Sequence, residues 1–207
     1  MSASGSSAAS ERRANAQPTM SVREMAHRIN NTLAVVQAII TQTARLTGDP
    51  ADFVDAVSRR IAAMAVANRS LLNGDHDGSD LETLVRQELE MQGAASTRLS
   101  LRGPRAALPS RSVVSFALVI HELATNAVKY GALSNDTGTV EMTWSVAPDS
   151  DARDMLSFLW RERGGPPVAP PRRKGFGSIV LERGLDDCKV SRSFEPEGLT
   201  CGIALPL

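Results

Sequence analysis

The first third of the chain carries two runs of apolar residues at helical spacing. The first run begins at Ser21, which together with Glu24 has the spacing of a capping box, and it is expected to end near Gly48. The second run follows Asp49-Pro50, a pair that suits an N-cap and the first position of a helix. The stripe residues are Met25, Ile29, Leu33, Val36 and Ile40 in the first run, and Val54, Val57, Ile61, Met64, Leu71 and the polar Asn68 in the second. The pattern predicts a helical hairpin, which favours a four-helix bundle made by two chains.

The rest of the chain alternates helical and strand patterns. Residues 73–80 are polar and turn-forming, and we expect the domain boundary there. Helices are predicted over 81–91, 110–130 with Gly131 as C-cap, and 178–187. Strands are predicted over 98–102, 139–146, 154–162, 189–195 and 199–207, with a loop over 164–177. This order predicts an α+β chain in which an α/β sandwich, a sheet with helices on one face, follows the hairpin.

Composition narrows the class of protein. The 207 residues suit one medium domain or two small ones, and equal numbers of acidic and basic residues argue against a nucleic-acid binder. No apolar run is long enough for a membrane span, and the N-terminus lacks the apolar core of a secretory signal. Cys188 and Cys201 form no metal or redox pattern. We therefore expect a cytoplasmic protein, with residues 1–18 as a disordered tail.

The helix predicted over 110–130 has one face of polar, chemically useful groups. At about 100° per residue, Glu122, Asn126 and Lys129 share a narrow arc. The opposite side is apolar and comprises Val113, Phe116, Ala117, Ile120, Ala124 and Ala127. An amide oxygen suits Mg²⁺, an ammonium suits phosphate, and a carboxylate suits a base or a metal-bound water. The alternative is an ordinary solvated face.

Two later segments add to this picture. Trp160-Arg161-Glu162 ends a strand and is followed by Gly164 and Gly165, so the carboxylate is a candidate acceptor for the exocyclic amine of adenine. Gly175-Phe176-Gly177 precedes a helix whose free N–H groups would suit phosphate, and Arg172, Arg173 and Lys174 lie just before it as candidates to cover a triphosphate. Ordinary turn chemistry and solvated charges are the alternative.

Together these motifs resemble the GHKL superfamily of ATP-binding domains, and more narrowly the HWE class of bacterial histidine kinases. The class name refers to a His in the N box and a Trp-x-Glu in the next box, which here are His121, Trp160 and Glu162. Upstream, residues 24–39 resemble the phosphoacceptor helix of the class. The resemblance covers roughly residues 21–207.

The resemblance implies a role for each matching residue. His27 would accept the γ-phosphoryl group of ATP, with Arg28 beside it to stabilise phosphate, and Glu122 would act as acid or base. Glu122 and Asn126 would hold Mg²⁺. The nucleotide would be bound by Asn126, Lys129, Tyr130, Trp160, Glu162, Gly164, Gly165, Arg173, Lys174, Gly175 and Gly177. Asn30 and Asn68 depart from the class, which usually has Lys and His there, and the group that deprotonates His27 stays open.

We therefore predict a tail over 1–18, a dimerisation and phosphotransfer hairpin over 19–76, and a Bergerat-type ATP-binding domain over 79–207. The implied function is autophosphorylation of His27 by ATP and Mg²⁺, followed by transfer to an Asp of a response regulator receiver domain. We expect a homodimer through residues 19–76 and, since the two domains fill the length, a separate sensor or regulatory protein. The alternatives are an ATP-independent phosphotransferase or scaffold, and a GHKL Ser/Thr kinase of the anti-sigma type.

Overall fold

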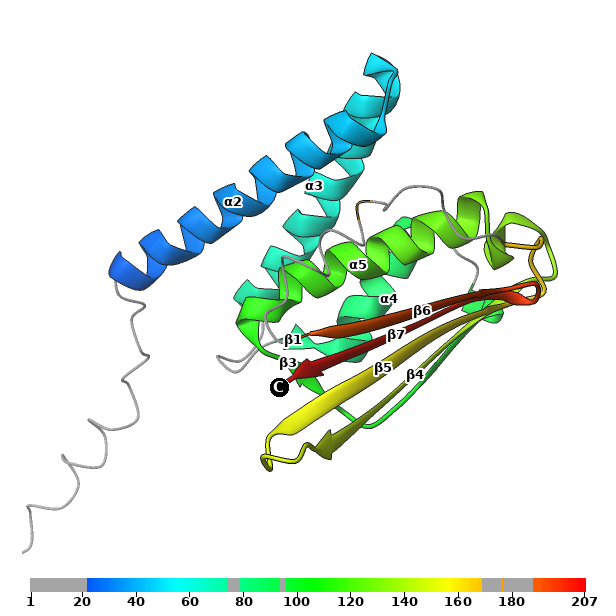
Figure 1. Ribbon diagram of the computed structural model, residues 1–207. Coiled ribbons are helices and arrows are strands. Elements are labelled where there is room, and N and C mark those ends of the chain that lie inside the picture. Colours follow the sequence, from blue (N-terminus) through cyan, green and yellow to red (C-terminus); the bar gives the residue numbers. More distant parts are fainter. Residues whose placement is uncertain (1–21, 74–78, 94–95, 169–175, 177–187) are drawn as a thin grey trace, which may run out of the picture. The chain divides into compact units, whose positions relative to one another are not determined.

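The computed structural model describes residues 22–73, 79–93, 96–168, 176 and 188–207 (Figure 1). The predicted tail, most of the basic loop and the predicted helix over 178–187 lie outside the described residues. The helices are α2 (Val22–Leu46), α3 (Pro50–Asn73), α4 (Leu81–Met91) and α5 (Ser110–Lys129), with short 3₁₀ turns over Ser96–Arg98 and Ala132–Ser134. The strands are β1 (Ser79–Asp80), β2 (Leu99–Arg102), β3 (Ala107–Leu108), β4 (Thr139–Pro148), β5 (Asp154–Arg163), β6 (Lys189–Glu195) and β7 (Gly198–Pro206).

The chain divides into two compact units between Ala38 and Ile39. The first unit contributes the N-terminal part of α2, in which Ile29 and Leu33 of the predicted stripe are 54% and 56% exposed. This division falls within α2 and does not coincide with the predicted boundary near residue 77. The assignment of functional domains therefore stays a prediction.

The second unit begins with the end of α2 and the start of α3. The predicted helix start at Pro50 is confirmed, because Asp49 Oδ1 accepts hydrogen bonds from the backbone N–H groups of Ala51 (2.7 Å) and Asp52 (3.2 Å). In α2 Ile39 and Thr43 are fully buried, whereas Ile40 of the predicted stripe is 43% exposed. Ile40 of the predicted stripe is therefore left partly uncovered by the described residues.

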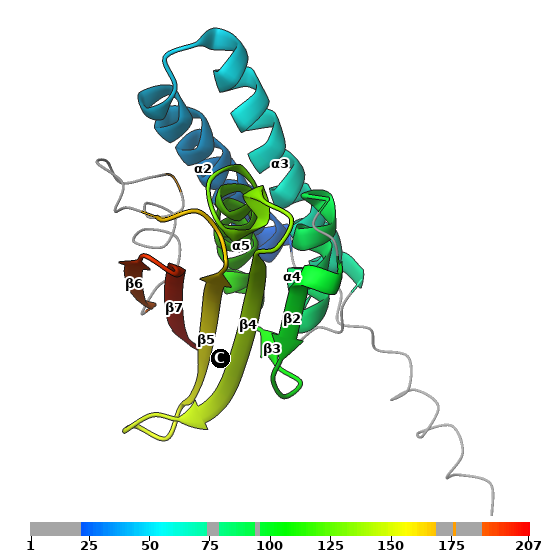
Figure 2. The same cartoon turned by 90° about the vertical axis from the view of Figure 1, so that its right-hand side faces the viewer.

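The sheet of the second unit has the strand order β2-β4-β5-β7-β6, which can be followed in Figure 2 from one edge of the sheet to the other. β2 pairs in parallel with β4, and the other neighbours are antiparallel. The β4–β5 and β6–β7 pairs are the two predicted hairpins. Glu162 lies opposite Val140, and Trp160 lies between Met142 and Cys201. Because strand residues alternate between faces, Trp160 and Glu162 share one face of β5.

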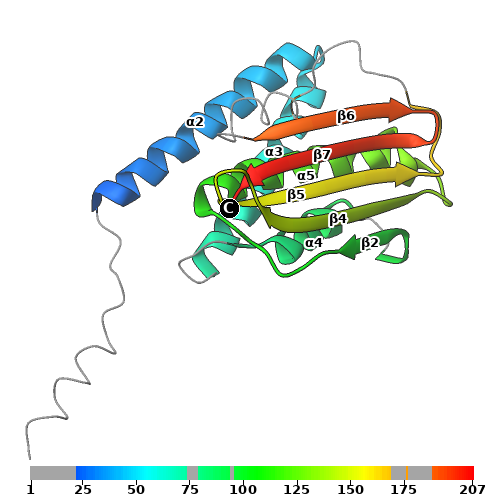
Figure 3. The same cartoon turned by 60° about the horizontal axis from the view of Figure 1, so that its bottom comes forward.

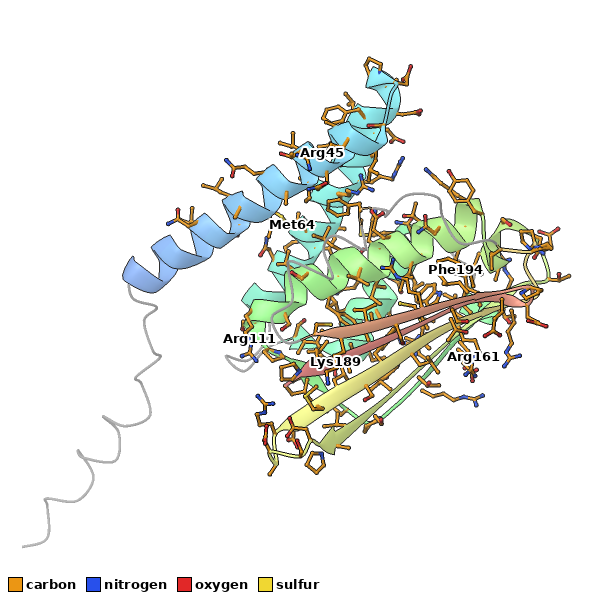
Figure 4. The ribbon with its side chains drawn as sticks, viewed as in Figure 1. Arg45, Met64, Arg111, Arg161, Lys189 and Phe194 are labelled. Atoms are coloured by element: carbon orange, nitrogen blue, oxygen red, sulfur yellow. The ribbon has the colours of Figure 1, made fainter. Side chains whose placement is uncertain are left out.

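One face of this sheet packs against α4 and α5, and no helix of the described part of the chain covers the other face (Figure 3). Side chains fill the layer between α5 and the sheet, and Phe194 of β6 packs against it (Figure 4). At its centre the ring of Phe116 meets Phe158 edge to face, with ring centroids 5.3 Å apart. The sheet with helices on one face, predicted from the order of elements, is confirmed. Within the described residues no helix combines the length and apolar character needed to cross a bilayer.

One local prediction was wrong. Ser79 and Asp80 were expected in a turn, but they form β1 and pair with Leu108 and Ala107 of β3. The pairing continues as the backbone N–H of Leu81 donates to the carbonyl of Ala106 (2.9 Å). Asp80 also caps α4, accepting a hydrogen bond from the backbone N–H of Thr83 (3.0 Å). A two-residue bridge to a distant segment leaves no periodic signal in the sequence.

Candidate functional site

The outer face of α5 carries the polar groups that the sequence predicted to lie together. Asn126, Lys129 and Tyr130 are exposed, the last at 70%, and Glu122 is half-buried. The opposite face is buried in the core from Val113 to Ala127. The helix and its C-cap therefore present an amide, an ammonium and a phenol ring to solvent within about one turn, with a carboxylate one turn before them.

Glu122 is held by an arginine that the sequence analysis did not single out. Arg60 of α3 donates from Nε to Glu122 Oε1 (2.8 Å) and from Nη2 to Glu122 Oε2 (3.1 Å). The two side chains are only 12% and 14% exposed, and α3 packs against α5 around them. Sequence reasoning missed Arg60 because a single basic residue on a helix gives no signal of its partner 62 positions away.

Glu162 lies buried at the C-terminal end of α5, with 3% of the residue exposed. Its Oε1 accepts a hydrogen bond from Trp160 Nε1 (3.1 Å), and its Oε2 accepts one from the backbone N–H of Ala132 (2.8 Å). Burial raises the pKa of the Glu162 carboxyl, while the hydrogen bonds from Ala132 and Trp160 act in the opposite direction. The Trp-x-Glu spacing thus lets the indole hold the carboxylate two residues later on the same strand.

The glycines of these motifs allow the two boxes to approach closely. Gly131 was predicted as the C-cap of α5, but Tyr130 is the C-cap and Gly131 has an ordinary φ of −107°. A Cβ on Gly131 would overlap the Glu162 carboxylate, and a Cβ on Gly165 would overlap the backbone of Gly131 and Ala132. Glycine is needed at both positions for space, and the segment after β5 lies directly against the segment after α5.

His121 points to a different part of the fold from Glu122. It is buried, with Nδ1 3.3 Å from Glu88 Oε2 and 3.2 Å from Gln92 Nε2. Glu88 is fully buried, and neither of its carboxylate oxygens has a hydrogen-bond partner among the described residues. Both partners of His121 belong to α4 or its C-cap. His121 therefore joins α4 to α5 inside the core and does not line the outer face of α5.

The remaining predicted site residues are described only in part. His27 and Arg28 lie in α2, but their side chains are outside the described ones. Arg173, Lys174, Gly175 and Gly177 are outside the described residues, whereas Phe176 between the two glycines is 1% exposed. Gly164 follows β5 with a φ of 71°, and its carbonyl accepts a hydrogen bond from Asn135 Nδ2 (2.8 Å).

The donor set on α5 fits a divalent cation bound together with phosphate. The described residues contain no group of three or more His, Cys, Asp and Glu that could hold a metal alone. Glu122 and Asn126 supply oxygen donors one turn apart, which suit Mg²⁺, an ion that keeps most of its other ligands as water and phosphate oxygens. The guanidinium of Arg60 already shows that the Glu122 carboxylate accommodates a positive group.

Comparisons with known proteins point to one family. A family model described as HWE histidine kinase matches residues 24–105. The chain is 36% identical, over 95% of its length, to a blue-light-activated histidine kinase of Brucella anthropi, and it spans about 40% of the length of that relative.

The solved structures agree in fold. The structure of a blue-light activated histidine kinase of Erythrobacter litoralis superposes with a TM-score of 0.62 at 12% identity. The match covers 91% of this chain and 62% of the Erythrobacter chain. The separate histidine kinase domain of that protein also matches 91% of this chain and 87% of its own, with a TM-score of 0.56 at 14% identity.

Proposed function

Because the chain belongs to the HWE histidine kinase family, we propose that it transfers the γ-phosphoryl group of ATP to His27 and then to an aspartate of a response regulator receiver domain. The observation that carries this proposal is the outer face of α5. There Asn126 and Lys129 are exposed one to two turns after the mostly buried Glu122, next to the buried contact between Glu162 and the end of the helix. These are the groups that a bound Mg²⁺ and nucleotide would need.

In the proposed reaction, a ring nitrogen of His27 attacks the γ-phosphorus. The new N–P bond forms as the bond from that phosphorus to the bridging oxygen breaks, ADP leaves, and the imidazole gives its proton to a base. Glu122 is the acidic residue of α5 and is our candidate for this base, or for orienting a water. Mg²⁺, held by Asn126 and Glu122, supplies charge neutralisation when bound.

The other site residues would bind and orient ATP. Lys129 offers an ammonium to phosphate, with Arg173 and Lys174 of the basic loop as further candidates. Both oxygens of Glu162 already accept protein hydrogen bonds. An adenine amine would therefore form a second bond to one of them, which the two lone pairs of each oxygen allow. Tyr130 is exposed one residue after α5 and would offer its ring to the nucleotide.

The direct test is labelling with ATP carrying ³²P at the γ-position. We expect acid-labile, base-stable label on the wild-type chain and none on His27→Ala. His76→Ala is the matched control, because His76 belongs to none of the motifs, and it should label like the wild type. Label that survives His27→Ala would contradict the proposal.

The same assay separates the alternatives. An ATP-independent phosphotransferase or scaffold would show no nucleotide binding but would accept phosphate from another phosphoprotein. A Ser/Thr kinase would label a partner with acid-stable phosphate and would keep its activity in His27→Ala. Rapid loss of the His27 label upon adding a phosphate-free receiver domain would support transfer to an aspartate.

We further propose a homodimer formed through residues 19–76. The exposed apolar side chains of the two hairpin helices support it, since Ile29, Leu33, Ile40, Val54 and Ile61 are 38–61% exposed. The proposed compartment is the cytoplasm, where ATP is available and the two free cysteines of the described chain would stay reduced. In this proposal the input signal reaches the chain through a separate sensor or regulatory protein.

A further inference from the structure

Arg60 makes contacts in three directions with a single guanidinium group. Nε and Nη2 bind the two oxygens of Glu122, and Nη1 donates to Thr43 Oγ1 (2.8 Å). The guanidinium carbon also lies 4.2 Å from the centre of the Phe176 ring. These partners come from α5, from the end of α2 and from the middle of the Gly175-Phe176-Gly177 box. One side chain of α3 thus touches three segments that the sequence assigns to phosphotransfer or nucleotide binding.

The contacts fix the orientation of the guanidinium as well as its position. The Thr43 hydroxyl donates its own proton to the carbonyl of Ile39 (2.5 Å), so its oxygen faces Arg60 as an acceptor. Phe176 and Thr43 are 1% and 0% exposed, so solvent is largely excluded from both. A bidentate Arg–carboxylate pair of this kind is strong and directional, and it is screened by salt less than an exposed pair.

The pair places Glu122 under two competing demands. As a ligand of Mg²⁺ or of a metal-bound water, the carboxylate would turn an oxygen toward a positive ion. In the structure the Arg60 guanidinium already donates hydrogen bonds to both oxygens of this mostly buried carboxylate. Two cations on one carboxylate repel each other strongly at low local dielectric. Binding of Mg²⁺ with nucleotide therefore has to displace Arg60 or weaken its hold.

We propose that Arg60 is a positioning residue that holds Glu122 in a resting arrangement and competes with Mg²⁺ for it. This inference rests on the proposed function, because it assumes that Glu122 serves a bound Mg²⁺-nucleotide. Release of Arg60 frees the carboxylate and at the same time loosens the contacts of α3 with Phe176 and Thr43. Occupation of the nucleotide site is thereby coupled to the hairpin helix that carries Arg60.

The experiment measures binding of a fluorescent ADP analogue to the full chain as MgCl₂ is titrated. In Arg60→Gln the Mg²⁺ concentration for half-maximal binding should fall about fivefold or more, the lower end of usual coupling between two sites. The matched control is Arg59→Gln, because Arg59 is the neighbouring arginine on α3 and its ion pair among the described residues is the local one with Asp55, one turn earlier. It should leave the midpoint unchanged. A merely structural Arg60 would lower thermal stability without moving this midpoint.

Glu122→Gln provides the second arm. If Arg60 acts through Glu122, then adding Arg60→Gln to Glu122→Gln should produce no further shift, whereas additive shifts would overturn the inference. Should Arg60→Gln fail to fold, Thr43→Val removes the acceptor of Nη1 together with the local hydrogen bond to the Ile39 carbonyl. It should shift the midpoint in the same direction, whereas Thr43→Ser, which keeps both hydrogen bonds, should leave it unchanged.

The outcomes for the two proposals are distinct. An Arg60→Gln midpoint equal to that of the wild type, or higher, overturns the role of Arg60 even if His27 is labelled normally. A lowered midpoint without any labelling of His27 supports the role of Arg60 and contradicts the transfer step. A wild-type chain that binds no nucleotide at any Mg²⁺ concentration overturns both proposals.

Discussion

Replacing Glu162 by Gln should destabilise the fold although the two side chains have nearly the same shape. The carboxylate accepts one hydrogen bond on each oxygen, from Trp160 at 3.1 Å and from the Ala132 backbone at 2.8 Å. A glutamine has one acceptor oxygen, so its NH₂ group must face one of these two donors. Leaving a buried donor unsatisfied costs about 1–3 kcal/mol. For a chain of this length that lowers Tm by about 2–4 °C per kcal/mol.

Urea denaturation of Glu162→Gln, of Trp160→Phe, of their double variant and of a control measures this effect. Glu141→Gln is the matched control, since Glu141 lies on neighbouring β4 with 35% of its side chain exposed and a long 3.7 Å ion pair to Arg161. Its unfolding free energy should change by at most about 0.5 kcal/mol. Adding Trp160→Phe to Glu162→Gln removes the unsatisfied donor, so the double variant should lose less than the sum of the single losses. A Glu162→Gln chain as stable as the wild type, or strictly additive losses, would refute the reasoning.

The same site predicts a dependence on pH. Burial raises the pKa of Glu162 in the folded chain, so the folded state holds this proton more tightly than the unfolded state does. The stabilisation is complete below the ordinary pKa of a glutamate and is lost as the pH rises through the raised folded value. With Glu162→Gln as reference, the wild type should gain stability as the pH falls through the raised folded pKa toward the ordinary pKa of a glutamate. A difference in unfolding free energy between the two chains that stays constant as the pH changes would contradict this prediction.

Three further measurements test other parts of the structure. His121→Leu removes the imidazole that lies 3.3 Å from the fully buried Glu88 carboxyl and should lower the unfolding free energy by about 1–3 kcal/mol in urea denaturation, whereas adding Glu88→Leu should restore part of it. Leu33→Glu puts a charge on the exposed apolar stripe and should shift light scattering toward monomer, while Ala38→Glu on another face of α2 should not. Burial raises the pKa of Cys188 to about 11, so its alkylation near neutral pH, followed by mass spectrometry, should be roughly a hundredfold slower than that of an ordinary thiol. Equal rates would show that the thiol is not protected.

The sequence was most informative where the signal is local. The bounds of α4, the helix start at Pro50 and the two hairpins follow from capping, periodicity and turn residues within a few positions. The polar face of α5 was equally accessible, because a 3.6-residue repeat separates Glu122 and Asn126 from the buried side. All of these depend on neighbours along the chain and not on the rest of the fold.

The contacts that complete the site depend on distant parts of the chain. Nothing near Arg60 or Glu122 in the sequence reveals that the two side chains meet. Gln92, a partner of His121, likewise lies 29 positions away in the sequence. Gly131 was interpreted as a helix cap, a local reason, but the structure requires glycine there because the Glu162 carboxylate fills the space of a side chain. Such requirements arise only when the two boxes are packed together.

The parallel pairing of β2 with β4 makes α5 a crossover helix, and this sets the order in which the nascent chain can fold. β2 ends at Arg102 and β4 begins at Thr139, so α5 leaves the ribosome before the long strands that cover it. Phe116 on its apolar side is covered by Phe158, which follows about 40 residues later, or about 2–8 s at usual rates of synthesis. During that interval the apolar side of α5 is exposed to water, and it is the surface on which aggregation or chaperone binding would begin.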